Sequence, residues 1–134
     1  MTHATTQPTF GDVLIVDDDL VILNVIVKAL VRDGYAVRRA VSGKEALTAI
    51  LARLPALLLL DLEMFGLNGD ELLVYVRTIY PHVPVVLITA YAERAQPLVN
   101  RYGVACMTKP FDLNDLLDYV ARYVQPERAN AVGQ

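Results

Sequence analysis

The sequence contains little of what several classes of protein depend on. Its 134 residues include one cysteine, Cys106, so no disulfide forms within the chain and a reducing compartment is expected. No apolar run approaches the roughly 18 residues of a membrane span, and the first ten residues lack a signal peptide's apolar core. The net charge of −3 gives no basic footprint for nucleic acid. These absences predict one soluble, cytoplasmic domain with no membrane or nucleic-acid partner.

What the sequence does contain is a series of short apolar runs, typical of strands buried on both faces of a parallel sheet. The runs are Val13–Val16, Ala56–Leu60, Val85–Ile88 and Val104–Met107, and residues 35–40 alternate like an edge strand. Amphipathic segments separate them. This order predicts an α/β fold, a doubly wound five-stranded parallel sheet with five helices. The domain should span residues 12–124, with a flexible tail at 1–11 and a second tail, or the start of a linker, at 125–134.

Capping and breaking residues predict where the helices begin and end. Asp33-Gly34 should end the first helix, Ser42 and Glu45 form a capping box for the second, Asn68–Glu71 caps the third and Asp112 the fifth. Pro97 interrupts the fourth helix, predicted at 92–102, which should begin late, fray or kink. The inward faces of the second, third and fifth helices are predicted to be Ala46, Leu47, Ile50 and Leu54; Leu72, Leu73, Val76 and Ile79; and Leu113, Leu116, Leu117 and Val120.

The first helix has an unusually narrow polar stripe, formed by Asn24, Lys28 and Arg32. Val21 and Val25 flank this stripe and are expected to be exposed. Two interpretations remain open: an ordinary helix surface with single exposed valines, or a docking patch for a partner helix.

Four of the five predicted strands stop at polar residues. Asp17 and Asp18 follow the first strand, Asp61 the third, Thr89 the fourth and Lys109 the fifth. Because parallel strands end at one edge of a sheet, these side chains should converge there. Carboxylates about 4 Å apart repel by ~4 kcal/mol at an effective dielectric near 20, so one must stay protonated or a cation must bind. A lysine, a hydroxyl, a divalent ion such as Mg²⁺ and a free carboxylate together predict phosphoryl transfer to an aspartate.

Each of these residues also has an ordinary structural interpretation. An aspartate after a strand is more often a helix cap or a turn residue than a nucleophile, and Asp17, Asp18 or Asp19 could cap the first helix. Thr89 alone would be a strand-end residue, and Lys109 alone a solvated one.

In this order and spacing, Asp17-Asp18, Asp61, Thr89-Ala90 and Lys109-Pro110-Phe111 resemble the receiver domain of two-component response regulators. The resemblance covers residues 12–124 and implies a flavodoxin-like fold of three layers with strand order 2-1-3-4-5. It implies that Asp61 accepts a phosphoryl group from a sensor histidine kinase or a histidine phosphotransfer protein, with Mg²⁺ or Mn²⁺ as cofactor. The signal would pass by protein contact, not enzymatic turnover, and a homodimer could form through the fourth helix, fifth strand and fifth helix.

The resemblance also implies a role for each matching residue. Asp18, Asp61 and the backbone carbonyl of Glu63 would ligate the ion directly, and Asp17 would act through water. Lys109 would hold a phosphoryl oxygen, and Thr89 would close onto the phosphoryl group. The Lys109–Pro110 bond is expected to be cis.

Three features depart from the family pattern. Cys106 stands where an aromatic switch residue is usual, so output runs through another residue, such as Tyr91 or Tyr102, or the chain mainly passes phosphate on. The thiol itself is either a buried small hydrophobe or redox-sensitive. Phe65 replaces a usual proline and would be a lid or a partner contact. Glu63 and Tyr91 flank the path of attacking water, and Tyr91 is predicted to slow hydrolysis of the acyl phosphate.

Two other functions fit parts of the pattern. A magnesium-dependent phosphohydrolase would also use an aspartyl phosphate, with Glu63 in the position of a second acid. It would turn over small phosphomonoesters, which a receiver should not do. A pseudo-receiver without chemistry is disfavoured because all five site residues are present.

Overall fold

The computed structural model describes residues 8–64 and 69–127 as alternating strands and helices around one parallel sheet. The strand order is β2-β1-β3-β4-β5, as the resemblance implied. In chain order the elements are β1 (Asp12–Val16), α1 (Leu20–Arg32), β2 (Ala36–Ala40), α2 (Gly43–Ala52), β3 (Leu57–Asp61), α3 (Gly69–Ile79), β4 (Val85–Thr89), α4 (Ala92–Tyr102), β5 (Ala105–Thr108) and α5 (Leu113–Tyr123).

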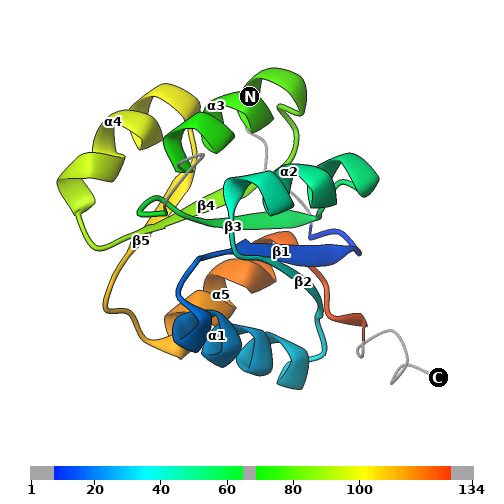
Figure 1. Ribbon diagram of the computed structural model, residues 1–134. Helices are drawn as coiled ribbons and strands as arrows, with labels where there is room; N and C mark the ends of the chain where they lie inside the picture. Colours follow the sequence, from blue (N-terminus) through cyan, green and yellow to red (C-terminus); the bar gives the residue numbers. More distant parts are fainter. Residues whose placement is uncertain (1–7, 65–68, 128–134) are drawn as a thin grey trace, which may run out of the picture.

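The helices cover both faces of the sheet, which gives three layers. Figure 1 shows α1 and α5 on one face and α2, α3 and α4 on the other. Each face has its own apolar core, because side chains alternate between the two sides of each strand. Leu58 and Leu60 of β3 pack towards α2 and α3, whereas Leu57 and Leu59 pack towards α1 and α5.

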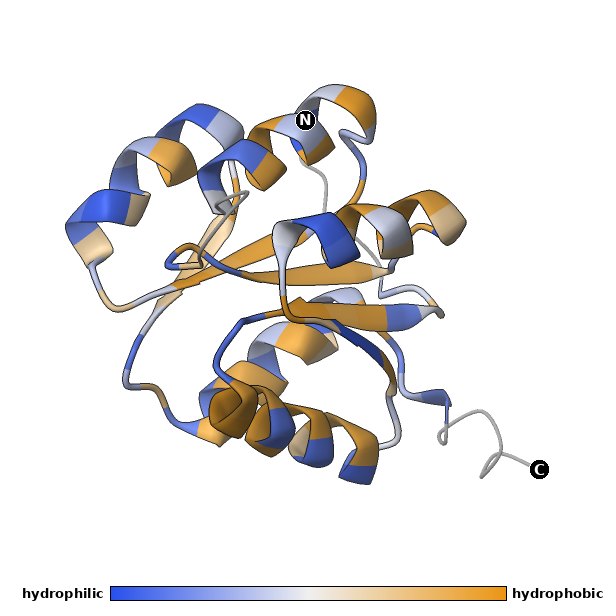
Figure 2. Ribbon diagram, in the orientation of Figure 1, coloured by the Kyte–Doolittle hydropathy of each residue, from blue (hydrophilic) through white to orange (hydrophobic). Residues whose placement is uncertain are grey.

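The depth of burial follows the strand order. Every residue of the three inner strands β1, β3 and β4 is buried, and the edge strands β2 and β5 are only partly so. Figure 2 shows the same contrast, with the inner strands strongly hydrophobic. This explains why the inner strands read as continuous apolar runs and residues 35–40 as an alternating one.

The predicted helix ends are largely confirmed. Asp19 caps α1 by accepting hydrogen bonds from the N–H groups of Val21 and Ile22, and Gly34 follows the helix with a φ of 93°. Asp112 caps α5 in the same way through the N–H of Asn114. The predicted cap at Asn68 lies outside the described residues.

The capping box of α2 is present with a small difference. The Ser42 hydroxyl accepts a hydrogen bond from the N–H of Glu45 at 3.1 Å, as predicted. The Glu45 carboxylate reaches back to the N–H of Val41, one residue before the cap, at 2.9 Å.

Three predictions about helices need correction. Helix α4 begins at Ala92 and continues through Pro97 to Tyr102, so the predicted late start and fraying are wrong; a bend there stays a prediction. The proline removes one bond of the helix ladder, while Ala95 anchors the helix in the core. Leu54 and Ile79 were predicted to face inward but are 48% and 50% exposed. Leu54 lies beyond the end of α2, and Ile79 is the last residue of α3.

The described ends of the chain lie side by side. Thr9 donates its N–H to the carbonyl of Tyr123, and its own carbonyl accepts from the N–H of Gln125. Glu127 is in turn bonded to the carbonyl of Gly34. Hydrogen bonding therefore extends beyond the predicted 12–124 boundaries on both sides. No helix within the described ranges has the length and apolar character of a membrane span.

Candidate functional site

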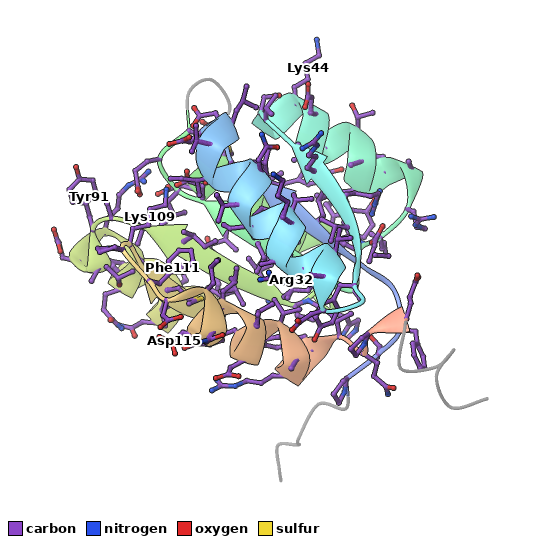
Figure 3. All side chains as sticks on the ribbon, turned by 90° about the horizontal axis from the view of Figure 1, so that it is seen from below. Arg32, Lys44, Tyr91, Lys109, Phe111 and Asp115 are labelled. Carbon is purple, nitrogen blue, oxygen red and sulfur yellow. The ribbon has the colours of Figure 1, made fainter. Side chains whose placement is uncertain are left out.

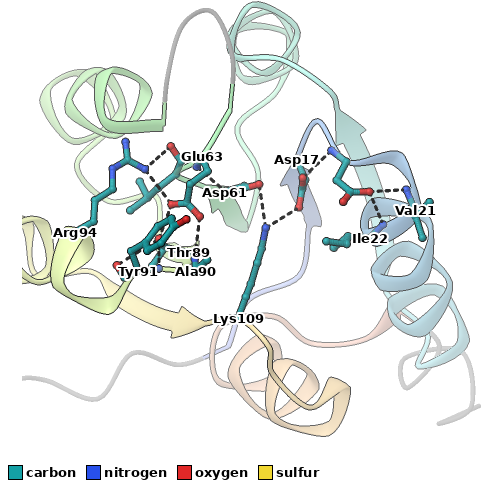
Figure 4. A network of polar contacts seen from close by, with 12 residues as sticks. Asp17, Val21, Ile22, Asp61, Glu63, Thr89, Ala90, Tyr91, Arg94 and Lys109 are labelled. Carbon is teal, nitrogen blue, oxygen red and sulfur yellow. Dashed lines mark hydrogen bonds and ion pairs between the residues drawn. The ribbon is translucent and has the colours of Figure 1, made fainter.

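The strand register brings the polar strand ends together at one edge of the sheet. Val16 pairs with Leu60, Asp61 with Ile88, and Thr89 with Thr108. The polar residues therefore leave adjacent strands at nearly the same level. Figure 4 shows Asp17, Asp61 and Lys109 facing one another across this edge, with Thr89 at the neighbouring strand end beside Glu63, so the polar strand ends converge as the sequence predicted.

Asp17, Asp18 and Asp61 form an acidic cluster. One carboxylate oxygen from each lies within 4.8 Å of the others. Asp17 is 1% exposed, and its Oδ2 atom has no hydrogen-bond partner among the described residues. Burial raises the pKa of Asp17 to about 7 and the charge of Asp61 adds to this rise, although the Asp19 N–H opposes it. An orphaned buried oxygen within an all-oxygen donor set fits a hard divalent cation such as Mg²⁺.

Lys109 partly balances the acidic cluster. Its Nζ atom lies 3.2 Å from Asp61 Oδ2 and 3.8 Å from Asp17 Oδ2. Burial lowers the pKa of Lys109, but the neighbouring carboxylates of Asp61 and Asp17 outweigh this effect and raise it. The lysine is therefore a fixed positive charge beside Asp61. The Lys109–Pro110 peptide bond is cis, which confirms that prediction.

Glu63 makes contacts that the sequence did not reveal. Its carboxylate accepts hydrogen bonds from the Thr89 hydroxyl and, at 2.8 Å, from the Ala90 N–H. Arg94 of α4 donates to the same carboxylate at 3.0 Å and to Asp70 of α3 at 2.7 Å. We call Glu63, Thr89, Ala90 and Arg94 the Glu63 bridge. Burial raises the pKa of Glu63, but these donors outweigh it, led by Thr89, and hold the pKa below its ordinary value.

Cys106 and Tyr91, two of the residues that depart from the family pattern, lie near this bridge. Burial raises the pKa of the Cys106 thiol and the charge of Glu63 raises it further, which favours the unreactive thiol over the redox-sensitive interpretation. Tyr91 is 55% exposed and its N–H donates to the Thr89 hydroxyl oxygen at 3.0 Å. In Figure 3 Tyr91, Lys109 and Phe111 lie at the same side of the molecule. Phe65 lies outside the described residues.

Gly69 allows the close approach of α3 to the end of β3. A Cβ atom at this position would lie 2.7 Å from the carbonyl oxygen of Asp61 and 2.8 Å from the Cα of Leu62. Both atoms belong to the backbone and cannot rotate away. Only glycine therefore fits here without moving the strand end that carries Asp61.

We expect Gly69→Ala to lower the free energy of unfolding by about 2 kcal/mol or more, as overpacking does in tight sites. Gly103→Ala is the control: its φ of 65° is strained for alanine, but an added Cβ would meet nothing within 4 Å. That strain costs about 1 kcal/mol. Urea denaturation compares the two variants, and a Gly69→Ala loss smaller than the Gly103→Ala loss would contradict the close approach.

The chain resembles known proteins over most of its length. The family model of the response regulator receiver domain matches residues 13–121. The chain is 34% identical over 113 residues to response regulator protein FleR of Pseudomonas aeruginosa, a match that covers 83% of this chain and 24% of FleR. It is 31% identical over 120 residues to sporulation initiation phosphotransferase F of Bacillus subtilis, with 88% of this chain and 96% of that protein covered.

Solved structures agree with these matches. Response regulator protein TrrA of Thermotoga maritima, in complex with Mg(2+)-BeF, superposes with a TM-score of 0.77 and 26% identity, covering 86% of this chain and all of that one. The chain thus spans about a quarter of FleR but nearly all of the sporulation phosphotransferase. It belongs to the response regulator receiver domains of two-component signalling systems.

Proposed function

We propose that this chain accepts a phosphoryl group on Asp61 from a phosphohistidine, with Mg²⁺ bound by the acidic cluster. The observation that carries the proposal is the convergence of Asp17, Asp61 and Lys109 at one sheet edge, where the buried Asp17 Oδ2 atom accepts no hydrogen bond from the described residues. The family membership supports the same reaction, because receiver domains exchange phosphoryl groups with histidine kinases or phosphotransfer proteins.

In this reaction a carboxylate oxygen of Asp61 attacks phosphorus as the phosphorus–nitrogen bond of the donor histidine breaks. The bonding electrons go to the leaving imidazole nitrogen, and an acyl phosphate forms on Asp61. Lys109 Nζ, already 3.2 Å from Asp61, offers its positive charge to a phosphoryl oxygen. Thr89 supplies a hydroxyl donor from the neighbouring strand end.

Asp17 and Asp18 would hold the cation together with Asp61 and the backbone carbonyl of Glu63. The ion, when bound, supplies positive charge that neutralises the phosphoryl oxygens. Mg(2+)-BeF is bound by TrrA, the relative described above, which supports Mg²⁺ as the ion here. Asp17 accepts the N–H of Asp19 at 2.9 Å through its other oxygen, so Oδ2 remains for the ion or its water.

The surface beside the site fits a phosphohistidine donor. A mostly apolar groove of about 470 Å³ runs between α1 and the start of α5, and Val21, Val25, Phe111 and Lys109 line it. Val21 and Val25 are 73% and 47% exposed, as the sequence predicted. Lys109 lines the groove and also contacts Asp61, so the groove ends beside the acceptor. A helix of the donor protein bound in this groove would therefore place its phosphohistidine near Asp61. Homodimerisation through α4, β5 and α5 stays a prediction.

The proposal is tested by incubating the protein with acetyl phosphate and Mg²⁺ and measuring intact mass. We expect one added phosphoryl group on the wild type and none on Asp61→Asn. The same samples are assayed with a small phosphomonoester, since continuous turnover would favour the phosphohydrolase instead. Absence of any mass increase, or an equal increase in Asp61→Asn, would overturn the proposal.

Tyr91 gives a further prediction about the lifetime of the acyl phosphate. Its exposed ring follows Thr89 by two residues and is predicted to hinder the approach of water. We expect Tyr91→Ala to accelerate dephosphorylation several-fold, and Tyr102→Ala, on the last turn of α4, to leave it unchanged. The rate at which the phosphorylated mass disappears, measured in a buffer without EDTA, gives the dephosphorylation rate of each variant. An unchanged decay in Tyr91→Ala would defeat this prediction.

A further inference from the structure

The Glu63 bridge engages the very hydroxyl that the proposed reaction needs. Thr89 is buried, and its single hydroxyl proton is donated to Glu63 while the oxygen accepts the N–H of Tyr91. A hydroxyl carries one proton, so it cannot donate to Glu63 and to a phosphoryl oxygen at once. The contacts of Thr89 with Glu63 and with the phosphoryl group therefore exclude each other.

The second donor in the bridge is committed in the same way. The Ala90 N–H lies 2.8 Å from Glu63 Oε1, so the two carboxylate oxygens of Glu63 each take one donor from the end of β4. Figure 4 shows this carboxylate between Arg94 and the Thr89–Ala90 corner, on the side of the site away from Asp17. Glu63 thus occupies an anion-binding corner next to Asp61 with a negative charge of the chain's own.

Arg94 holds Glu63 in this position. Its Nη1 atom donates to Glu63 Oε2 at 3.0 Å and to the carbonyl of Leu62 at 2.7 Å, and its Nη2 atom donates to Asp70 at 2.7 Å. Arg94 lies in the first turn of α4, Asp70 in the first turn of α3 and Glu63 two residues after the end of β3. The bridge therefore ties the site to the beginnings of two helices.

We propose, on the basis of the phosphoacceptor function above, that Glu63 is a positioning residue that holds Thr89 and Ala90 in the unphosphorylated protein and competes with the phosphoryl group for them. Phosphorylation of Asp61 displaces the Glu63 carboxylate, and its release from Thr89 changes the contacts of Arg94 and so of α4. This gives the chain a route from Asp61 to α4 that does not use position 106. Cys106 is too small to act as an aromatic switch.

The first part of the test needs no phosphoryl donor. Ala90 is an exposed residue whose N–H is bonded to Glu63, so hydrogen exchange of this amide reports on the bridge directly. We expect the exchange to become about tenfold faster in Glu63→Ala, the loss of a hydrogen bond to a charged group. Glu63→Gln, which keeps one acceptor oxygen, should fall between the two. Glu93→Gln removes an exposed charge next to Arg94 and should exchange like the wild type.

The second part measures competition with Mg²⁺ and beryllofluoride as the probe, a stable stand-in for a phosphoryl group on a carboxylate. We expect about tenfold tighter binding by Glu63→Ala than by wild type, an intermediate value for Glu63→Gln, and no change for Glu93→Gln. Arg94→Gln, which loosens the bridge without removing the carboxylate, should also bind more tightly. The changes in NMR chemical shift of the α4 amides on binding the probe should be smaller in Glu63→Ala, because Arg94 has already lost its contact with the Glu63 carboxylate.

The two hypotheses fail in different ways. If wild type and Glu63→Ala bind the probe with equal affinity, or if Ala90 exchanges equally in both, the competition by Glu63 is overturned and the phosphoacceptor function stands. If no variant binds the probe and none gains a phosphoryl group from acetyl phosphate, the phosphoacceptor function falls, and the competition falls with it.

Discussion

Without divalent ions, the free energy of unfolding should fall as the pH rises from about 4.5 to 7. Asp17 has a folded-state pKa of about 7, raised from 3.8 mainly by burial, so the folded protein keeps a proton that the unfolded chain has lost. Stability falls with pH wherever the folded state binds more protons. The shift corresponds to at most about 4 kcal/mol at 1.36 kcal/mol per pKa unit. Glu63 acts in the opposite direction, but only below its ordinary pKa, outside this window.

Mg²⁺ should remove this loss. An ion at the acidic cluster replaces the proton of Asp17, so its affinity increases up to about pH 7 and its binding stabilises the folded state alone. Urea denaturation at several pH values, with EDTA or with excess Mg²⁺, measures both effects. Asp17→Asn is the matched control: it should flatten the pH dependence in EDTA and remove most of the stabilisation by Mg²⁺. A wild-type stability in EDTA that is flat or rising over this range would contradict the buried protonated carboxyl.

The second large effect is expected far from the site, at Asp12. Its side chain is 4% exposed and forms ion pairs with Arg38 and Arg53 at the start of β1. Arg38 also donates hydrogen bonds to the carbonyls of Ala49 and Arg53, both at 2.7 Å. These bonds connect the C-terminal end of α2 to β2, the edge strand of the sheet. The buried Asp12 carboxylate of β1 therefore connects β1 to β2 through Arg38 and to the end of α2 through Arg53.

Asp12→Asn should lower the free energy of unfolding by about 3 kcal/mol, because removing one partner leaves the half-buried Arg38 charge uncompensated. Arg53→Met should cost less than about 1 kcal/mol, since the Arg53 side chain is 70% exposed and water screens its pair with Asp12. Chemical denaturation of both variants at neutral pH gives the comparison. Equal losses in the two variants would show that burial of Asp12 does not set the energy of this cluster.

The sheet and the principal site residues could be predicted because they depend on regular patterns. A continuous apolar run such as Ala56–Leu60 predicts an inner strand, and parallel strands necessarily bring Asp61 and Lys109 to one edge. Helix periodicity is less reliable near a helix end. Leu54 and Ile79 match the apolar pattern, but Leu54 lies beyond the end of α2 and Ile79 is the last residue of α3. Both side chains are therefore exposed.

Contacts between distant side chains could not be read from any pattern. Glu63 lies 26 residues from Thr89 and 31 from Arg94 in sequence, and Asp12 lies 41 from Arg53. The sequence placed the Glu63 backbone through the family resemblance, but the direction of its carboxylate depends on Arg94 in another helix. A charged residue two positions after the acceptor strand, with an arginine in the first turn of the helix after Thr89, is the signal that could have suggested the bridge.

The most direct measurement of the central claim is to trap the phosphorylated residue itself. Borohydride reduces an acyl phosphate to an alcohol, so the modified aspartate is converted to homoserine and is found by peptide mass fragmentation. After treatment with acetyl phosphate and Mg²⁺, homoserine should appear at position 61, in the tryptic peptide spanning 54–77, and should be absent when EDTA replaces Mg²⁺. Homoserine at position 17 or 18, or at no position, or an equal yield in EDTA, would contradict the assignment of Asp61 as a magnesium-dependent phosphoacceptor.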